Sequence, residues 1–123
     1  MRKRVLIADD SVRIREVLRM LFSSQVPEIE ICGEAVDGLD TIKKAMVLEP
    51  DLVLLDLIMP EMNGAEVASV LRKNMPETLI ILFTMYGENI GRALTSVVGV
   101  DVVLSKPDGL SQILNSVKTL LAF

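Results

Sequence analysis

Three acidic residues, a threonine and a lysine stand out because they lie at the ends of short apolar runs. Asp9 and Asp10 follow the first run, Asp56 the third and Thr84 the fourth, and Lys106 lies two residues beyond the fifth. Neighbouring carboxylates repel one another unless a cation lies among them. Ligand sets made only of oxygen suit a hard divalent ion. If the fold brings these ends together, the sequence predicts a site for Mg²⁺ or Mn²⁺.

The same residues suggest a reaction at phosphorus. A carboxylate can act as a nucleophile and form an acyl phosphate, which adds roughly one negative charge. A divalent cation and the Lys106 ammonium would stabilise that charge, and Thr84 could donate a hydrogen bond to a phosphoryl oxygen. Asp56 is the best candidate for the nucleophile because it ends the most apolar run.

The apolar runs alternate with segments of helical spacing. The runs are Val5–Ala8, Ile29–Cys32, Leu52–Leu55, Leu79–Phe83 and Val100–Leu104. The helical segments are residues 14–22, Leu39–Met46, Ala65–Leu71, Ile90–Val98 and Leu110–Leu121. Such alternation predicts parallel strands joined by crossover helices, hence a three-layer α/β sandwich of (βα)5 type. Ligands of open α/β sheets bind at the carboxyl ends of the strands, where the acidic residues lie.

Two further features refine this architecture. The second run carries Glu28 and Glu30 at its start and predicts an edge strand, whereas the third, fourth and fifth read as strands covered on both faces. At 123 residues and 13.5 kDa the chain predicts a single domain over residues 1–123.

Composition excludes several classes of function. Thirteen Lys and Arg against seventeen Asp and Glu give a net charge of −4, which argues against direct nucleic acid binding. The absence of histidine excludes catalysis by Ser-His-Asp or Cys-His groups. Cys32, the single cysteine, predicts a small packing residue. The apolar run after Arg4 is too short for a signal peptide or a membrane span, so we expect a cytoplasmic protein without membrane association.

These motifs together resemble the receiver domains of two-component response regulators, of the chemotaxis-regulator type, over the whole chain. The matching segments are Val5–Asp10, Glu34–Gly38, Pro50–Asp56, Asp56–Gly64, Thr84 and Ser105–Pro107. The resemblance implies a flavodoxin-like (βα)5 fold with strand order 2-1-3-4-5.

It also implies a role for each acidic residue. Asp56 would accept a phosphoryl group from the phosphohistidine of a sensor histidine kinase or a histidine phosphotransfer protein. Asp10, Asp56 and the backbone carbonyl of Ile58 would bind Mg²⁺ or Mn²⁺, with Asp9 acting directly or through a metal-bound water. The absence of histidine fits, because the donor must be another molecule.

The remaining implied features concern the phosphoryl group and the output. Thr84 and Lys106 would hold the phosphoryl oxygens, with Lys106 placed by a cis peptide before Pro107. The chain would catalyse only its own phosphorylation and dephosphorylation. Phosphorylation would shift the surface of the fourth helix, fifth strand and fifth helix toward a downstream protein, as a monomer or a phosphorylation-dependent dimer.

Three positions depart from the family pattern. Val103 stands where the family usually has the aromatic residue that reorients on activation, although Tyr86 could supply a ring nearby. Met85 stands where a small residue usually leaves the phosphoryl group accessible. Tyr86 and Ile58 occupy the two variable positions that tune phosphoryl lifetime. We therefore expect slow phosphoryl turnover, and faster turnover in Met85→Ala.

The helices suggest two protein-binding surfaces. The fourth helical segment is unusually apolar, which fits either a wide core-facing stripe or an output face. The first carries Arg13, Arg15 and Arg19, which we predict to form a solvated face, and Val12, which the resemblance makes an exposed contact for a kinase.

Alternative functions remain at this point. One is a phospho-inert, receiver-like binding module, suggested by Val103; another is the receiver fragment of a larger transcriptional regulator, although an end soon after the fifth helix favours a stand-alone receiver. An aspartyl phosphatase would need a second acid where Ile58 stands. A flavin-binding electron carrier would need a Ser/Thr/Gly-rich loop after the first strand, where the chain has Asp-Asp-Ser-Val-Arg.

Overall fold

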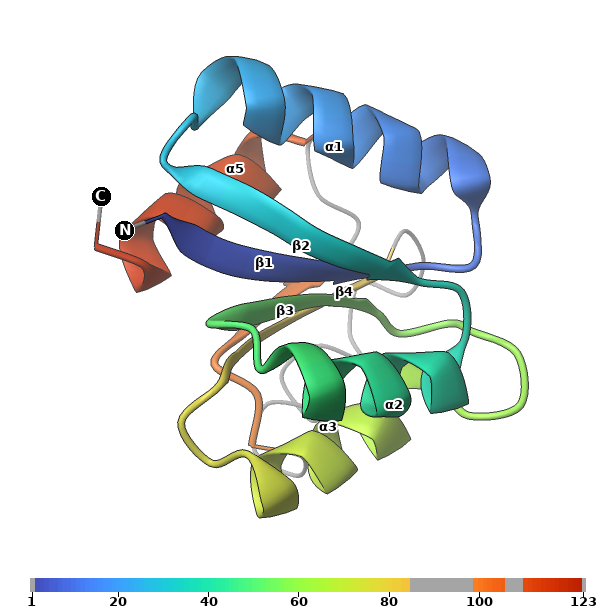
Figure 1. The fold of residues 1–123 in the computed structure, drawn as a ribbon. Coiled ribbons are helices and arrows are strands. Elements are labelled where there is room, and N and C mark those ends of the chain that lie inside the picture. The colour runs from blue at the N-terminus through green and yellow to red at the C-terminus, as the bar shows by residue number, and fades with distance from the viewer. Residues whose placement is uncertain (1, 85–98, 106–109, 123) are drawn as a thin grey trace.

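The chain forms one parallel five-stranded sheet in the computed structural model, which describes residues 2–84, 99–105 and 110–122. The strands are β1 (Lys3–Ala8), β2 (Ile29–Ala35), β3 (Leu52–Asp56), β4 (Leu79–Thr84) and β5 (Val102–Ser105). Their order in the sheet is β2-β1-β3-β4-β5 (Figure 1), which confirms the flavodoxin-like order 2-1-3-4-5.

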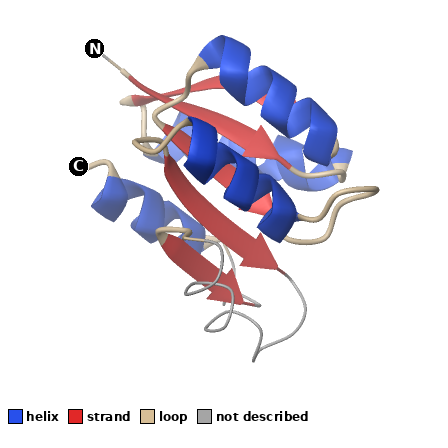
Figure 2. Cartoon of the chain, turned by 90° about the horizontal axis from the view of Figure 1, so that it is seen from below, coloured by secondary structure: helices blue, strands red, loops and turns tan. Residues whose placement is uncertain are grey.

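Helices cover both faces of this sheet. They are α1 (Val12–Gln25), α2 (Gly38–Leu48), α3 (Gly64–Asn74) and α5 (Ser111–Leu120). Figure 1 shows α1 and α5 on one face and α2 and α3 on the other, which gives the predicted three layers. Figure 2 shows the sheet between these helices from below. The predicted helix over Ile90–Val98 lies outside the described residues.

The central strand β3 divides the apolar core in two. Leu52 and Leu54 pack with α1 and α5 in one buried cluster, and Val53 and Leu55 pack with α2 and α3 in the other. Successive side chains of a strand point to opposite faces, so a continuous apolar run suits a strand covered on both sides. This burial fixes where β3 ends, and therefore where Asp56 lies.

The two edges of the sheet differ from each other. β2 forms one edge, as predicted, and the register with β1 shifts so that Val5 pairs with Ile31 but Leu6 pairs with Gly33. β5 forms the other edge, where Val102–Leu104 are half-buried. Val102 and Leu104 pack against the cluster of α1 and α5 and Val103 against the cluster of α2 and α3, so both faces of this strand contact the core, as predicted.

Two smaller expectations concern membranes and the cysteine. Within the described ranges, no helix has the length and apolar character that crossing a membrane requires. Cys32 is half-buried and packs against the α2 and α3 cluster, and burial raises the pKa of its thiol. It is therefore a packing residue, as the sequence suggested.

Candidate functional site

The three predicted carboxylates meet at the carboxyl end of the sheet. Asp9 and Asp10 follow β1, and Asp56 ends β3, which pairs directly with β1 through Ala8 and Leu55. One carboxylate oxygen from each residue lies within 4.8 Å of the others. Asp9 is buried with 3% of its surface exposed, Asp56 is half-buried and Asp10 is exposed, so the cluster opens to solvent on one side.

Local hydrogen bonds fix two of these side chains. The Ser11 N–H donates to Asp9 Oδ1 at 2.7 Å, and the Ser11 hydroxyl in turn accepts from the Ile14 N–H as the N-cap of α1. The Ile58 N–H donates to Asp56 Oδ1 at 3.2 Å. Ser11, rather than Asp9 or Asp10, therefore caps the helix, which leaves the acid pair facing Asp56.

Burial and a neighbouring carboxylate raise the pKa of two members of the cluster, Asp56 and Asp9. Burial and the neighbouring Asp9 charge raise the pKa of Asp56 to about 7. Burial also raises the pKa of Asp9, and Asp10 adds to that effect. Both causes disfavour the ionised forms, and a divalent cation would reverse them. The all-oxygen donor set and its mutual repulsion fit Mg²⁺ or Mn²⁺.

Strand pairing brings Thr84 to the same end of the sheet. In the register of β3 and β4, Asp56 lies opposite Phe83, and Thr84 is the next residue of β4. The Thr84 side chain is buried. Thr84 pairs in turn with Ser105 of β5. Of the other predicted site residues, Lys106, Met85 and Tyr86 lie outside the described residues, as does the peptide bond before Pro107.

Gly64 lies against the backbone of Asp56. Its N–H donates to the Leu57 carbonyl at 2.7 Å, and a Cβ at this position would lie 2.3 Å from the Asp56 carbonyl oxygen. Asn63 caps α3 in a capping box with Glu66, as expected of a residue pair at a helix start. The sequence placed Gly64 at the end of a segment that resembles the receiver family, but it gave no signal that this glycine supports the acidic residue itself.

Arg15 corrects the prediction of a solvated arginine face on α1. Arg13 is exposed, but the Arg15 side chain is 10% exposed and lies between α1, β1 and β2. It donates to the Asp9 carbonyl at 2.6 Å and to Glu34 Oε1 at 3.1 Å. A signal was present, because Arg15 precedes the buried Leu18 and Phe22 by three and seven residues, on the same helical stripe.

Comparison with known proteins agrees with the geometry. The model of the response regulator receiver domain matches residues 5–118. The chain belongs to this family. All three carboxylates of the cluster lie inside the matched region.

Relatives of the receiver domain include longer proteins. The response regulator protein VraR of Staphylococcus epidermidis is 36% identical over 117 residues, which cover 94% of this chain and 54% of VraR. A protein-glutamate methylesterase/protein-glutamine glutaminase of Pyrococcus abyssi is 41% identical over 85 residues, covering 69% of this chain and 23% of the relative. The receiver domain therefore spans about half or less of these curated relatives.

Solved receiver structures share the fold over their whole length. The response regulator domain of Thermotoga maritima CheB has a TM-score of 0.86 at 29% identity, covering 100% of this chain and 98% of that one. Thermotoga maritima TrrA, solved in complex with Mg(2+)-BeF, has a TM-score of 0.84 at 32% identity, covering 96% and 98%. These likenesses confirm the flavodoxin-like fold.

The described residues include Val103 and Ile58 among the positions singled out against the family pattern, and also Val12. Val103 is half-buried in β5 and packs against the α2 and α3 cluster. Ile58 is 53% exposed in the loop after β3, and Val12 is exposed at the start of α1. Val103 therefore serves as a packing residue at the position where the family usually has an aromatic ring.

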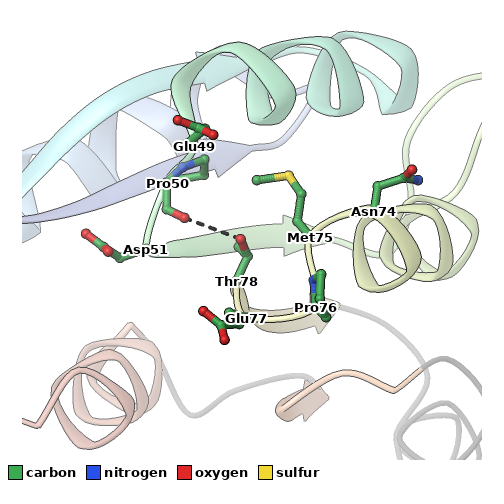
Figure 3. Close-up of a pocket in the computed structure, with 8 residues that line it drawn as sticks. All are labelled: Glu49, Pro50, Asp51, Asn74, Met75, Pro76, Glu77 and Thr78. Carbon is green, nitrogen blue, oxygen red and sulfur yellow. Dashed lines mark hydrogen bonds between the residues drawn. The ribbon is translucent and has the colours of Figure 1, made fainter.

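A groove of about 500 Å³ lies at the other end of the sheet (Figure 3). It is formed by the segments that lead into β3 and β4, and a weak hydrogen bond of 3.5 Å joins the Thr78 hydroxyl to the Pro50 carbonyl across it. Its lining residues are Glu49, Pro50, Asp51, Asn74, Met75, Pro76, Glu77 and Thr78. None of them belongs to the carboxylate cluster, so this groove is separate from the candidate site.

Proposed function

We propose that this receiver domain is a phosphoacceptor of a two-component phosphorelay, with Asp56 as the residue that is phosphorylated. The observation that carries the proposal is the approach of Asp9, Asp10 and Asp56, whose carboxylate oxygens lie within 4.8 Å at the carboxyl ends of β1 and β3. Membership of the receiver family supports it. We take residues 1–123 to be a single receiver domain.

The proposed metal site uses the acidic cluster. Asp10, Asp56 and the backbone carbonyl of Ile58 would hold Mg²⁺ or Mn²⁺, with Asp9 binding directly or through a water. The oxygen-only donors and the raised pKa of Asp56 support this assignment. When bound, the cation supplies positive charge that keeps the carboxylates ionised and offsets the charge of a phosphoryl group. Bound Mg²⁺ and BeF in the related TrrA structure agree with it.

The chain's own side chains would act on the phosphoryl group. The Asp56 carboxylate attacks phosphorus, an O–P bond forms, and the P–N bond of the donor phosphohistidine breaks with its electron pair going to the imidazole. The Thr84 hydroxyl donates to one phosphoryl oxygen and the Lys106 ammonium pairs with another. The domain would catalyse only its own phosphorylation and dephosphorylation, and the esterase activity named for the Pyrococcus relative belongs to a chain of which this domain matches 23%.

The partners follow from this chemistry. The donor would be a sensor histidine kinase or a histidine phosphotransfer protein in the cytoplasm. The output would pass to a downstream protein through the surface of the fourth helix, β5 and α5, in a monomer or a phosphorylation-dependent dimer. We propose no direct contact of this domain with nucleic acid or membrane. The chain covers 54% of VraR, which supports one alternative, that this domain is the receiver of a longer regulator.

Intact mass measurement tests the acceptor directly. The wild type and Asp56→Asn are incubated with Mg²⁺ and acetyl phosphate, and we expect one added phosphoryl group in the wild type alone. No added mass in the wild type, together with no Mg²⁺-dependent binding of beryllofluoride, would instead favour the phospho-inert module that Val103 suggests. Beryllofluoride binding without added mass would indicate a competent site with slow chemistry.

Phosphoryl lifetime tests the proposed role of Met85. If this side chain restricts attacking water, Met85→Ala loses its phosphoryl group faster than the wild type does. The rate is measured by the decay of the phosphorylated mass after acetyl phosphate is removed. An unchanged rate would contradict the role proposed for Met85 and leave that of Asp56 intact.

A further inference from the structure

Arg15 connects the start of α1 to the ends of β1 and β2. Its Nη1 donates to the backbone carbonyl of Asp9 at 2.6 Å, and its Nε donates to Glu34 Oε1 at 3.1 Å. The side chain is 10% exposed, so water competes little for these contacts. A buried guanidinium with two fixed acceptors is a rigid connection between three elements.

The hydrogen bond from Arg15 is one of three that hold Asp9 in place. The Asp9 N–H donates to the Ala35 carbonyl of β2 at 3.0 Å, and its carboxylate accepts from the Ser11 N–H at 2.7 Å. The carbonyl is the third group, and Arg15 is its donor. Arg15 is the only one of these three partners that contacts Asp9 through its own side chain, so replacing it removes the contact and leaves the Asp9 carboxylate and the backbone unchanged.

We propose that Arg15 is a positioning residue for the divalent cation: it holds the Asp9 backbone so that the Asp9 carboxylate faces Asp10 and Asp56, and so strengthens metal binding although it is itself a cation. This inference rests on the proposed function, because it concerns the same metal site. Removing a group that hydrogen-bonds to a metal ligand and orients it commonly weakens metal binding by about tenfold or more.

Charge and geometry predict opposite results when Arg15 is replaced. Removing a positive charge near the carboxylate cluster makes the site more negative, and charge alone would then tighten Mg²⁺ binding. Removing the donor to the Asp9 carbonyl loosens the residue and would weaken binding. Glu34 pairs with Arg15 and balances part of its charge, and we expect the loss of position to dominate.

Arg19 offers a matched control on the same helix. It lies one turn beyond Arg15 and pairs with the other oxygen of the same carboxylate, Glu34 Oε2, with 47% of its side chain exposed. The described structure shows no hydrogen bond from Arg19 to Asp9. Arg19→Gln and Arg15→Gln therefore remove the same charge from the same partner and differ in the Asp9 contact and in burial.

The test is a Mg²⁺ titration of the wild type, Arg15→Gln and Arg19→Gln, followed by the backbone amide signals in two-dimensional NMR. Because native signals report only folded protein, the Kd is measured apart from stability, which urea unfolding without Mg²⁺ gives separately. We expect the Kd of Arg15→Gln to rise about tenfold and that of Arg19→Gln to stay within about twofold of the wild type or to fall.

Any one of three outcomes would overturn the inference. Arg15→Gln could bind Mg²⁺ as tightly as the wild type or more tightly, which would leave Arg15 with a structural role only and the proposed function intact. A wild type that binds no Mg²⁺ would overturn both. If Arg15→Gln does not fold, Arg15→Lys keeps the charge but cannot make both contacts, and a Kd equal to that of the wild type would contradict positioning.

Discussion

The two ends of the sheet use aspartate in opposite ways. At the amino end, Asp101 accepts from the Ile80 N–H and from Arg72, both at 2.7 Å, and Asp51 accepts from the Arg4 N–H at 2.8 Å. At the carboxyl end, Asp9 and Asp56 lie against each other and against Asp10. Asp101 is paired with a cationic side chain, whereas the carboxylates at the carboxyl end lie next to one another.

This difference separates structural acids from the candidate site. Arg72 also donates to the carbonyls of Pro76, Thr78 and Gly99, so the amino end joins α3 to the segments that lead into β4 and β5. Paired charges of this kind stabilise a connection. Gathered carboxylates repel one another in the metal-free fold, and a bound cation would offset that repulsion. Substitutions at the two ends should therefore affect stability and metal binding differently.

Gly64→Ala should have the largest effect, because it disturbs the support of the carboxyl end. The added Cβ would meet the Asp56 carbonyl oxygen and the Leu57 Cα, and backbone atoms cannot move aside easily. We expect a loss of about 2–3 kcal/mol in the free energy of unfolding, together with weaker Mg²⁺ binding. Urea unfolding and the Mg²⁺ titration measure the two effects.

Gly33→Ala is the control for this substitution. There the nearest atom to the new Cβ is Leu48 Cδ1, the far end of a flexible side chain. We expect a smaller loss of stability and an unchanged Mg²⁺ Kd. If both substitutions changed the stability and the Mg²⁺ Kd equally, the contact between Gly64 and the Asp56 backbone would not matter for metal binding.

Arg72→Met should reduce stability without changing metal affinity. The substitution leaves Asp101 without its cation and three carbonyls without their donor, at a cost of about 1–3 kcal/mol. The Mg²⁺ Kd should stay within about twofold of the wild type, because the carboxylate cluster lies at the other end of the sheet. A large change in Kd would mean that the two ends are energetically coupled.

Asp56→Asn should stabilise the metal-free protein in a manner that depends on pH. The pKa of Asp56 is about 7 in the folded chain against 3.8 in the reference state, so the wild type loses stability as the pH rises from about 4 to 7. Asparagine does not ionise, so the variant does not lose this stability as the pH rises. In EDTA we expect its Tm to exceed that of the wild type by several degrees at about pH 8 and by little at about pH 4.

Added Mg²⁺ provides the comparison for this measurement. It should raise the Tm of the wild type at about pH 8 and have a much smaller effect on Asp56→Asn, because one ligand has lost its charge. A variant that is no more stable than the wild type in EDTA would contradict the mutual repulsion of the cluster.

Asn63→Ala should have the smallest effect. It removes the capping box at the start of α3, which costs about 1 kcal/mol, while Asn63→Ser retains a cap and should be close to neutral. Thermal unfolding of both variants measures the difference. A loss in the serine variant as large as that in alanine would assign Asn63 a role beyond capping.

The sequence predicted the elements and the acidic cluster because both depend on local patterns. Apolar runs marked the five strands, and parallel strands must end at a common edge, which brought Asp9, Asp10 and Asp56 together. Arg15 was misassigned because a charged residue on an apolar stripe becomes buried only when partners such as Glu34 come from elsewhere in the chain. Such partners are tertiary information that a local pattern does not contain.

The ends of the strands were less predictable, because they too depend on partners from elsewhere in the chain. The second strand was expected to end at Cys32 and continues to Ala35, and the fifth begins at Val102 rather than Val100. Gly33 and Glu34 have low strand propensity, but pairing with β1 extends the strand through them. Asp101 is held outside β5 because its carboxylate binds Arg72 and the Ile80 N–H.

The register shift in β2 has a consequence for insertions and deletions. Ile31 faces α1, Cys32 and Gly33 both face α2, and Glu34 faces α1 again, where it meets Arg15. Ile31 and Glu34 face the same side although they are three positions apart, whereas in a regular strand residues on one face are an even number of positions apart. The strand therefore has one residue more than regular alternation requires. A homologue with one residue fewer here could keep both its core and its ion pair, whereas the same deletion in β3 would exchange its two layers.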